Sequence, residues 1–137
     1  LWKDIRHDVI ASQSETADTV EIPRANDGHY YITLTIAGQP LTFMADTGAS
    51  GVVLSQDDAE HLGIDLQSLV YAGQSATANG MVRTARVRLS DVTLGPWHDD
   101  SIGAFVNDGA MVGSLLGMDY LGRYAIEIAG DRMILRR

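Results

Sequence analysis

Length, composition and charge limit what this chain can be. Its 137 residues are 45% hydrophobic, include no cysteine and carry a net charge of −8, which suits a single domain and excludes disulfides and cysteine-based metal sites. The acidic balance disfavours nucleic acid and anionic membrane surfaces as partners, because both require clustered Lys and Arg. Its four histidines lack metal-ligand spacing, so we expect no metal.

The first residues are interpreted as an extension. Because the chain starts at Leu1 and not at Met, we expect a signal or anchor segment upstream. Residues 1–25 would then be an N-terminal extension or linker, followed by a domain over residues 26–137. Within the extension, Thr19 to Pro23 alternate polar and apolar residues and could form an edge strand that the proline ends.

The domain opens with a predicted hairpin. Alternating apolar residues from Tyr30 to Ile36 are followed by a turn over residues 37–40 and by the apolar run Leu41 to Ala45. A short strand over residues 52–54 comes next. Residues 57–62 then predict a helix that Ser55 caps and Gly63 ends.

The acid that ends the second strand is the main candidate for chemistry. Asp46 is followed by the small residues Thr47 to Gly51. Glycine has no Cβ, so backbone and substrate can approach closely in such a turn. The alternative is an ordinary turn, because Asp, Thr and Gly are all common in turns.

A long hairpin is predicted over residues 69–89. Its tip, Asn79-Gly80, is small and polar, which is typical of a plain two-residue turn or of a mobile flap over a cleft. Arg83, Arg86 and Arg88 recur at close intervals after the tip. We interpret them mainly as a solvated face, with substrate binding as the lesser alternative.

A second informative stretch follows residue 113. Leu115-Leu116-Gly117 predicts an apolar strand that feeds a short helical turn and packs beside the strand that carries Asp46. By itself it could equally be an ordinary core strand with a glycine stop. Residues 123–128 and 132–135 predict a closing hairpin across Gly130-Asp131.

Together these motifs resemble the retropepsin-like aspartic proteases. The resemblance rests on Met44 to Ala49, the tip Thr77 to Gly80, and Ser114 to Met118, which occur in the family's order and approximate spacing. It extends from Gly28 to the C-terminus. The chain is most similar to the bacterial branch, whose protease domain lies in the periplasm and is often tethered to the inner membrane.

The resemblance implies an all-β fold, a closed barrel with a flap hairpin and one or two short helices. It also implies an aspartic endopeptidase without a cofactor, acting on protein or peptide substrates. Hydrolysis by this route needs two carboxyl groups, and this chain has one Asp-Thr-Gly; Asp119 lies outside any such motif. A homodimer with two Asp46 residues at its active site is therefore expected.

Site roles follow by resemblance, residue by residue. The catalytic group is Asp46, Thr47 and Gly48, with Thr47 bonding across the dimer. Substrate would contact Ala49, Ala78, Asn79, Gly80 and Met81, while Leu115, Leu116 and Gly117 give structural support. Apolar specificity pockets are expected from Val53, Met81, Ile102 and Leu115.

Two departures from the retroviral pattern concern the dimer. Retroviral enzymes follow Leu-Leu-Gly with Arg and then Asn or Asp, whereas Met118-Asp119 stands here. The chain also ends in a long hairpin instead of one short terminal strand.

A catalytically silent peptide-binding or dimerisation module of the same fold is the alternative function. Motifs of zinc metalloproteases and serine hydrolases do not occur.

Overall fold

The computed structural model describes residues 13–77 and 80–137. This part of the chain is mostly β, and none of its helices has the length and apolar character needed to cross a membrane. Its elements are β1 (Ser14–Glu15), β2 (Val20–Pro23), β3 (Tyr31–Ile36), β4 (Gln39–Ala45), β5 (Val52–Leu54), α2 (Gln56–His61), the 3₁₀ turn η1 (Leu66–Ser68), β6 (Gly73–Thr77), β7 (Gly80–Leu94), β8 (Trp97–Asn107), β9 (Ser114–Leu116), α3 (Met118–Leu121), β10 (Ala125–Ala129) and β11 (Arg132–Arg136).

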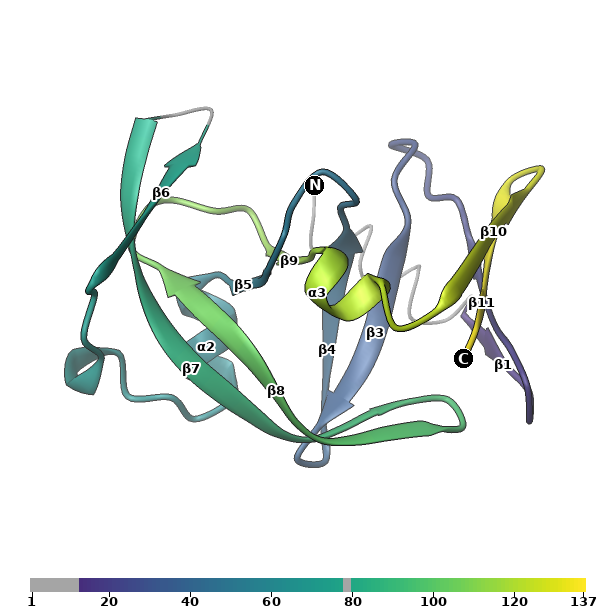
Figure 1. Cartoon of the computed structure of the whole chain (residues 1–137), viewed down its shortest axis with the longest axis horizontal. Coiled ribbons are helices and arrows are strands. Elements are labelled where there is room, and N and C mark those ends of the chain that lie inside the picture. The colour runs from purple at the N-terminus through teal and green to yellow at the C-terminus, as the bar shows by residue number, and fades with distance from the viewer. Residues whose placement is uncertain (1–12, 78–79) are drawn as a thin grey trace.

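The central feature is a closed barrel (Figure 1). Strands β3, β4, β9, β5, β8 and β7 are hydrogen-bonded in that order, and β7 returns to β3 through the pairs Thr35–Thr93 and Ile36–Val92. Outside this ring, β6 pairs with the first part of β7 and forms the flap hairpin. The expected closed barrel with a flap and short helices is confirmed.

The first hairpin shows how local sequence builds the barrel. β3 and β4 meet at Ala37 and Gly38, whose φ angles of 49° and 83° give the left-handed turn that suits a two-residue hairpin. Ile32, Leu34 and Ile36 point into the core and are buried. Burying each such side chain contributes about 1.5–3 kcal/mol, so the alternating pattern fixes which face of β3 lies inside.

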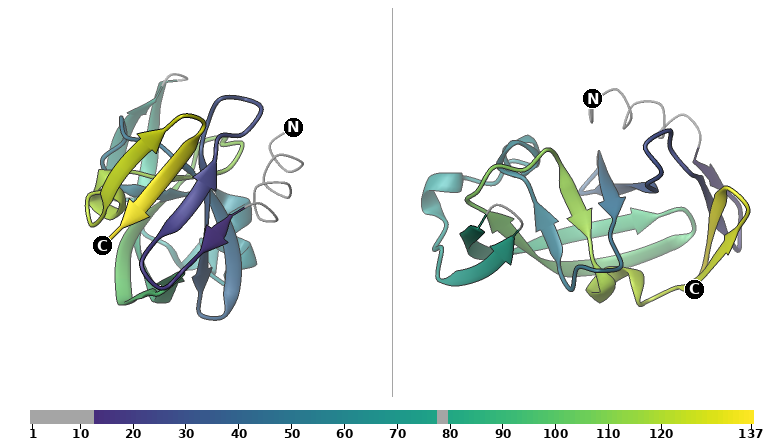
Figure 2. Two further views of the ribbon diagram at one scale, coloured as in Figure 1. Left: turned by 90° about the vertical axis from the view of Figure 1, so that its right-hand side faces the viewer. Right: turned by 90° about the horizontal axis from the view of Figure 1, so that it is seen from above.

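A second sheet lies at one end of the barrel, in the order β1-β2-β11-β10 (Figure 2). Residues 20–23, the candidate strand of the predicted extension, form β2. This strand is not at the edge, because β1 pairs with its other side. Val20 and Ile22 are fully buried, so this segment is part of the core. The predicted closing hairpin is confirmed as β10 and β11.

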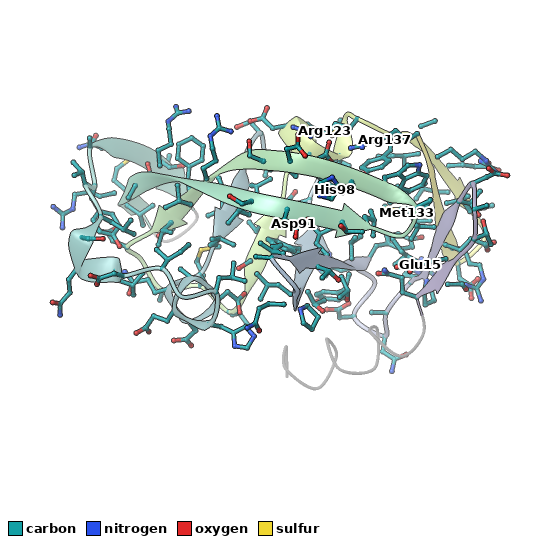
Figure 3. All side chains as sticks on the ribbon, turned by 90° about the horizontal axis from the view of Figure 1, so that it is seen from below. Glu15, Asp91, His98, Arg123, Met133 and Arg137 are labelled. Carbon is teal, nitrogen blue, oxygen red and sulfur yellow. The ribbon has the colours of Figure 1, made fainter. Side chains whose placement is uncertain are left out.

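Buried and charged side chains fasten this terminal sheet to the barrel. Asp99 of β8 accepts from Arg123, just after α3, at 3.0 Å and from Arg137 at 2.7 Å. Both arginines are seen beside the β7–β8 ribbon in Figure 3. The guanidinium of Arg137 also lies 4.9 Å from the ring centre of Tyr124, which itself packs on Trp97. The terminal sheet, α3 and β8 are thus held as one unit.

Candidate active site

Asp46 lies immediately beyond the end of β4, in a tight turn of backbone hydrogen bonds. Its amide donates to the carbonyl of Leu116 at 2.9 Å, and the amide of Ala49 donates back to the Asp46 carbonyl at 3.1 Å. The amide of Gly48 donates to Asp46 Oδ1 at 3.0 Å. Asp46 is half-buried, and the bond from the Gly48 amide holds its carboxylate in one orientation.

The strand β9 and the start of α3 support this turn from behind. β9 lies between β4 and β5, parallel to the first and antiparallel to the second. Beyond it, the amides of Gly117, Met118 and Asp119 donate to the carbonyls of residues 51, 49 and 50 at 3.0, 2.9 and 2.7 Å. A Cβ at Gly117 would lie 2.4 Å from the Gly51 carbonyl oxygen, so only glycine fits. The predicted packing of this strand beside the one that carries Asp46 is confirmed.

A buried polar network anchors the other end of β9. Ser114 donates from Oγ to Asp58 Oδ2 at 2.6 Å and accepts from the amide of Ser55 at 3.0 Å. Ser55 Oγ in turn caps α2 by accepting from the amide of Asp58 at 3.1 Å. All three residues are buried. Because β9 also accepts from the Asp46 amide, this network fixes the helix, the strand and the turn relative to one another.

A hollow of about 710 Å³ opens in front of Asp46 and is called the site hollow below. Its floor is the turn, with Asp46, Gly48 and Ala49, and Val53 and Leu115 add apolar surface. The flap side contributes Ser75, Ala76, Thr77 and Val82. The last residue of β8 and the segment after it contribute Asn107, Gly109, Ala110 and Met111. The site hollow therefore lies between the flap and the floor.

Several residues singled out in the sequence lie elsewhere. Thr47 is exposed beside the site hollow, and Leu116 and Gly117 lie behind the turn. Gly80 and Met81 begin β7 and are exposed, while Ala78 and Asn79 fall outside the described residues. Ile102 does not line the site hollow: its side chain is 4% exposed and belongs to the core, because strand alternation directs it inward.

The segment after β8 is a part of the site hollow that sequence reasoning missed. In the sequence, Asn107-Asp108-Gly109 ends an apolar run and so indicates a turn. The neighbouring residues do not indicate which strand this turn contacts. In the structure Asp108 binds the part of β7 around Arg83, where the flap hairpin leaves the barrel and which is called the flap stem below. It accepts from the amide and Nε of Arg83 at 2.7 and 3.0 Å, and its own amide donates to the Arg83 carbonyl at 3.0 Å.

The charges near the site hollow define its chemistry. The backbone amide of Arg83, assisted by its guanidinium, holds the pKa of the Asp108 carboxyl below its usual value. Within residues 13–77 and 80–137 no cluster of three His, Cys, Asp or Glu side chains could hold a metal ion. Asp46 is the acid at the floor of the site hollow.

Comparison with known proteins agrees with this geometry. A family model for aspartyl proteases matches residues 32–120. The chain is 34% identical over 129 residues to an uncharacterised protein of a Sinorhizobium species, covering 93% of this chain and 55% of that protein. It is 39% identical over 115 residues to an uncharacterised protein of Rickettsia prowazekii, covering 83% and 49%. The chain thus spans about half the length of these relatives.

A solved structure with a similar fold also belongs to an aspartic protease. The crystal structure of a retropepsin-like aspartic protease from Rickettsia conorii superposes with a TM-score of 0.79 at 37% identity, covering 90% of this chain and 93% of that one. Fold, family model and sequence identity agree. The chain belongs to the retropepsin-like aspartyl protease family.

Proposed function

We propose that this protein is an aspartic endopeptidase that hydrolyses peptide bonds in extended protein segments. The observation that carries the proposal is the position of Asp46. Its carboxylate is fixed by the Gly48 amide at the floor of a hollow that the flap strands β6 and β7 border. A substrate in that hollow would be held close to the acid, with strand-like backbone bonding to the flap.

The reaction needs a second carboxyl group. One carboxylate accepts a proton from the attacking water, and a protonated partner donates to the carbonyl oxygen of the scissile bond. Two such acids side by side share one proton, because like charges at close range disfavour double ionisation. The chain has one Asp-Thr-Gly, so the proposed active unit is a homodimer in which each copy supplies Asp46.

Thr47 supports the dimer proposal. It is exposed beside Asp46, and within the described parts of the chain no hydrogen bond of its side chain is found. A hydroxyl in that position can reach the matching turn of a second copy. Resemblance to the bacterial branch favours the periplasm as the location, with an inner-membrane tether upstream of Leu1 and the residues before β1 as the connection. Fractionation of cells that express the complete gene product tests this.

Replacement of Asp46 tests the chemistry. Asp46→Asn should reduce cleavage of denatured casein at mildly acidic pH by about a thousandfold or more, because the amide cannot take a proton from water. The circular dichroism spectrum and unfolding midpoint should stay close to those of the parent. Asp57→Asn makes the same change at an exposed acid on α2 and should keep full activity.

The alternative is a silent module that binds extended peptides without turnover. It predicts that the parent and Asp46→Asn bind a peptide alike and that neither cleaves it at any pH. Cleavage retained by Asp46→Asn would show that another group performs the reaction, and the proposal would then be wrong.

A further inference from the structure

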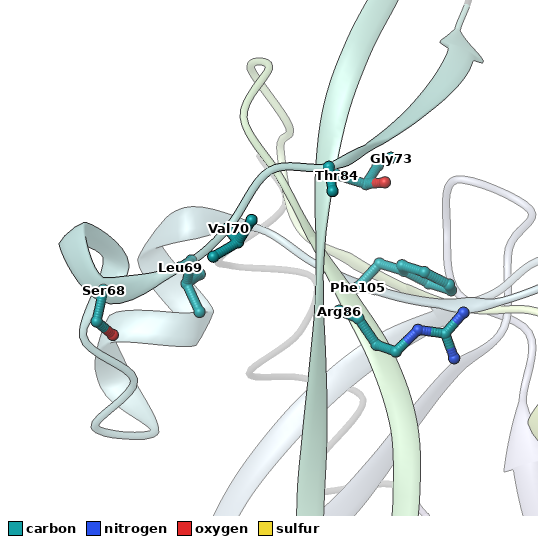
Figure 4. Close-up of a pocket in the computed structure, with 8 residues that line it drawn as sticks. Ser68, Leu69, Val70, Gly73, Thr84, Arg86 and Phe105 are labelled. Atoms are coloured by element: carbon teal, nitrogen blue, oxygen red, sulfur yellow. The ribbon is translucent and has the colours of Figure 1, made fainter.

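A second hollow of about 560 Å³ lies beside the flap stem (Figure 4). Leu69 and Val70, between η1 and β6, form an apolar wall, and the ring of Phe105 and the side chain of Arg86 lie across from them. Gly73 and Thr84 form its border on the flap side. This second hollow is mostly apolar, with one cationic group.

Strand register shows that the two hollows share one surface. On β7, Val82 lines the site hollow, and Thr84 and Arg86 line the second hollow. These residues are two apart, so their side chains lie on the same face of the strand. Their partners on the flanking strands follow the same rule: Ser75 pairs with Val82, Thr84 with Asn107, and Arg86 with Phe105.

The catalytic turn also reaches this surface. Gly51 lines the site hollow, and a Cβ built on it would lie 3.3 Å from the Phe105 ring. The Phe105 ring therefore lies next to the end of the turn that starts at Asp46. The face of β6, β7 and β8 that borders the site hollow thus continues to the second hollow.

Arg86 is the only charged residue that lines the second hollow, among the residues described there. Its guanidinium lies 5.2 Å from the ring centre of Phe105. Within the described parts of the chain it forms no ion pair, whereas Arg83, Arg123 and Arg137 are each paired with an aspartate. In a protein of net charge −8, this cation is available for an anionic group of a ligand.

We propose that the second hollow is an outer subsite of the cleft that binds an acidic side chain of the substrate. This inference rests on the proposed peptidase function. The carboxylate of a substrate Asp or Glu pairs with Arg86, and its methylene groups pack on Phe105, Leu69 and Val70. Val82 and Arg86 are four residues apart on one strand, which is about 13 Å, so the acid lies about four residues along the substrate from the residue beneath Val82.

Charge reversal at Arg86 tests the subsite. Random-sequence synthetic peptides are digested with the protein, and the cut sites are identified by mass spectrometry. With the parent, Asp and Glu should be enriched about 1.5- to fivefold at one fixed outer position, the range expected for an ion pair at a partly exposed site. With Arg86→Glu the enrichment should pass to Lys and Arg at that same position.

Arg88→Glu is the matched control, because it makes the same charge change two residues further along β7. Arg88 lines neither hollow, and its guanidinium donates to Ser101 Oγ at 3.1 Å. It should leave the acidic preference intact. An equal shift in Arg88→Glu would mean that overall charge sets the preference, and no outer acidic preference in the parent would mean that the second hollow is not a subsite. Either result would overturn the proposal.

A binding measurement separates this inference from the proposed function. Asp46→Asn is titrated with two fluorescent peptides that differ only in Glu or Lys at the outer position, with and without Arg86→Glu. Tighter binding of the Glu peptide that reverses with Arg86→Glu supports the subsite even if the parent cleaves nothing. Cleavage by the parent with equal binding of both peptides supports the peptidase and refutes the subsite.

Discussion

At the scale of single residues, the site depends on small side chains as much as on its acid. Asp46 can be positioned only because the turn that follows it packs directly on β9 and the start of α3. Gly117 is the point of closest approach, with the carbonyls of Ala49 and Gly51 where its Cβ would be. Both obstacles are backbone atoms that themselves belong to the turn, so they cannot move aside without displacing Asp46.

Gly117→Ala should therefore destabilise the protein by about 2–3 kcal/mol, the upper range for overpacking a buried position. Activity of the folded fraction should also fall, since relief of the clash shifts the catalytic turn. Gly103→Ala is the control, because no atom lies within 4 Å of its Cβ position. Denaturant unfolding of the two variants measures the difference, and equal stabilities would contradict the role given to Gly117.

At the scale of elements, β7 links the flap to the barrel. It runs from Gly80 at the flap to Leu94, near the pairing with β3 that closes the barrel. One strand therefore joins the flap hairpin to the barrel. The pair formed by Arg83 and Asp108 fastens the flap stem to the segment after β8. Their neighbours Val82 and Gly109 line the site hollow. The contact thus sets how the flap sits above the floor.

The contribution of this pair to stability should depend on pH. Because Arg83 lowers the pKa of Asp108 in the folded state, the contribution is present above the unfolded pKa and is lost as pH falls through the lowered folded value. Asp108→Asn should be less stable than the parent at neutral pH. The difference should shrink as the pH falls below the carboxyl's usual 3.8 and vanish below the lowered folded value. The contact therefore persists at the mildly acidic pH proposed for the reaction.

NMR titration of the Asp108 carboxyl checks the cause. Its midpoint should lie below 3.8 in the parent. In Arg83→Gln it should rise only in part, because the backbone amide of residue 83 still donates to the carboxylate. A midpoint at or above the usual value in the parent would show that the pair does not form in solution.

At the scale of the whole molecule, the four-stranded terminal sheet joins β1 and β2 to β10 and β11. This sheet is held to the barrel through Asp99 and its two arginines. Its outer strand β10 is short and mostly exposed, with Ile128 among its exposed residues. Among the described residues this sheet is formed by strands of one chain, while the proposed active site needs a second Asp46.

Activity should therefore depend on protein concentration, whereas folding of the subunit should not. On dilution below the dimer dissociation constant, specific activity should fall roughly in proportion to protein concentration while the circular dichroism spectrum stays unchanged. Analytical ultracentrifugation over the same range should show the change from dimer to monomer, and Thr47→Val should move it to higher concentration. Constant specific activity in a purely monomeric sample would contradict the two-acid site.

The sequence by itself determined the local features: the hairpin that ends at Asp46, the helix capped by Ser55 and the Leu115-Leu116-Gly117 strand. Each is specified by neighbours in the chain, through alternation, turn residues and caps. Tertiary structure alone decided that Ser114 meets Asp58, that Asp108 binds Arg83, and that Arg86 faces Phe105 on the surface continuous with the catalytic turn. These contacts join distant segments, and their register comes from barrel closure and core packing, which no local pattern encodes. Asp46 was therefore readable as a catalytic candidate from its own neighbourhood, whereas the shape and charge of the cleft around it were not.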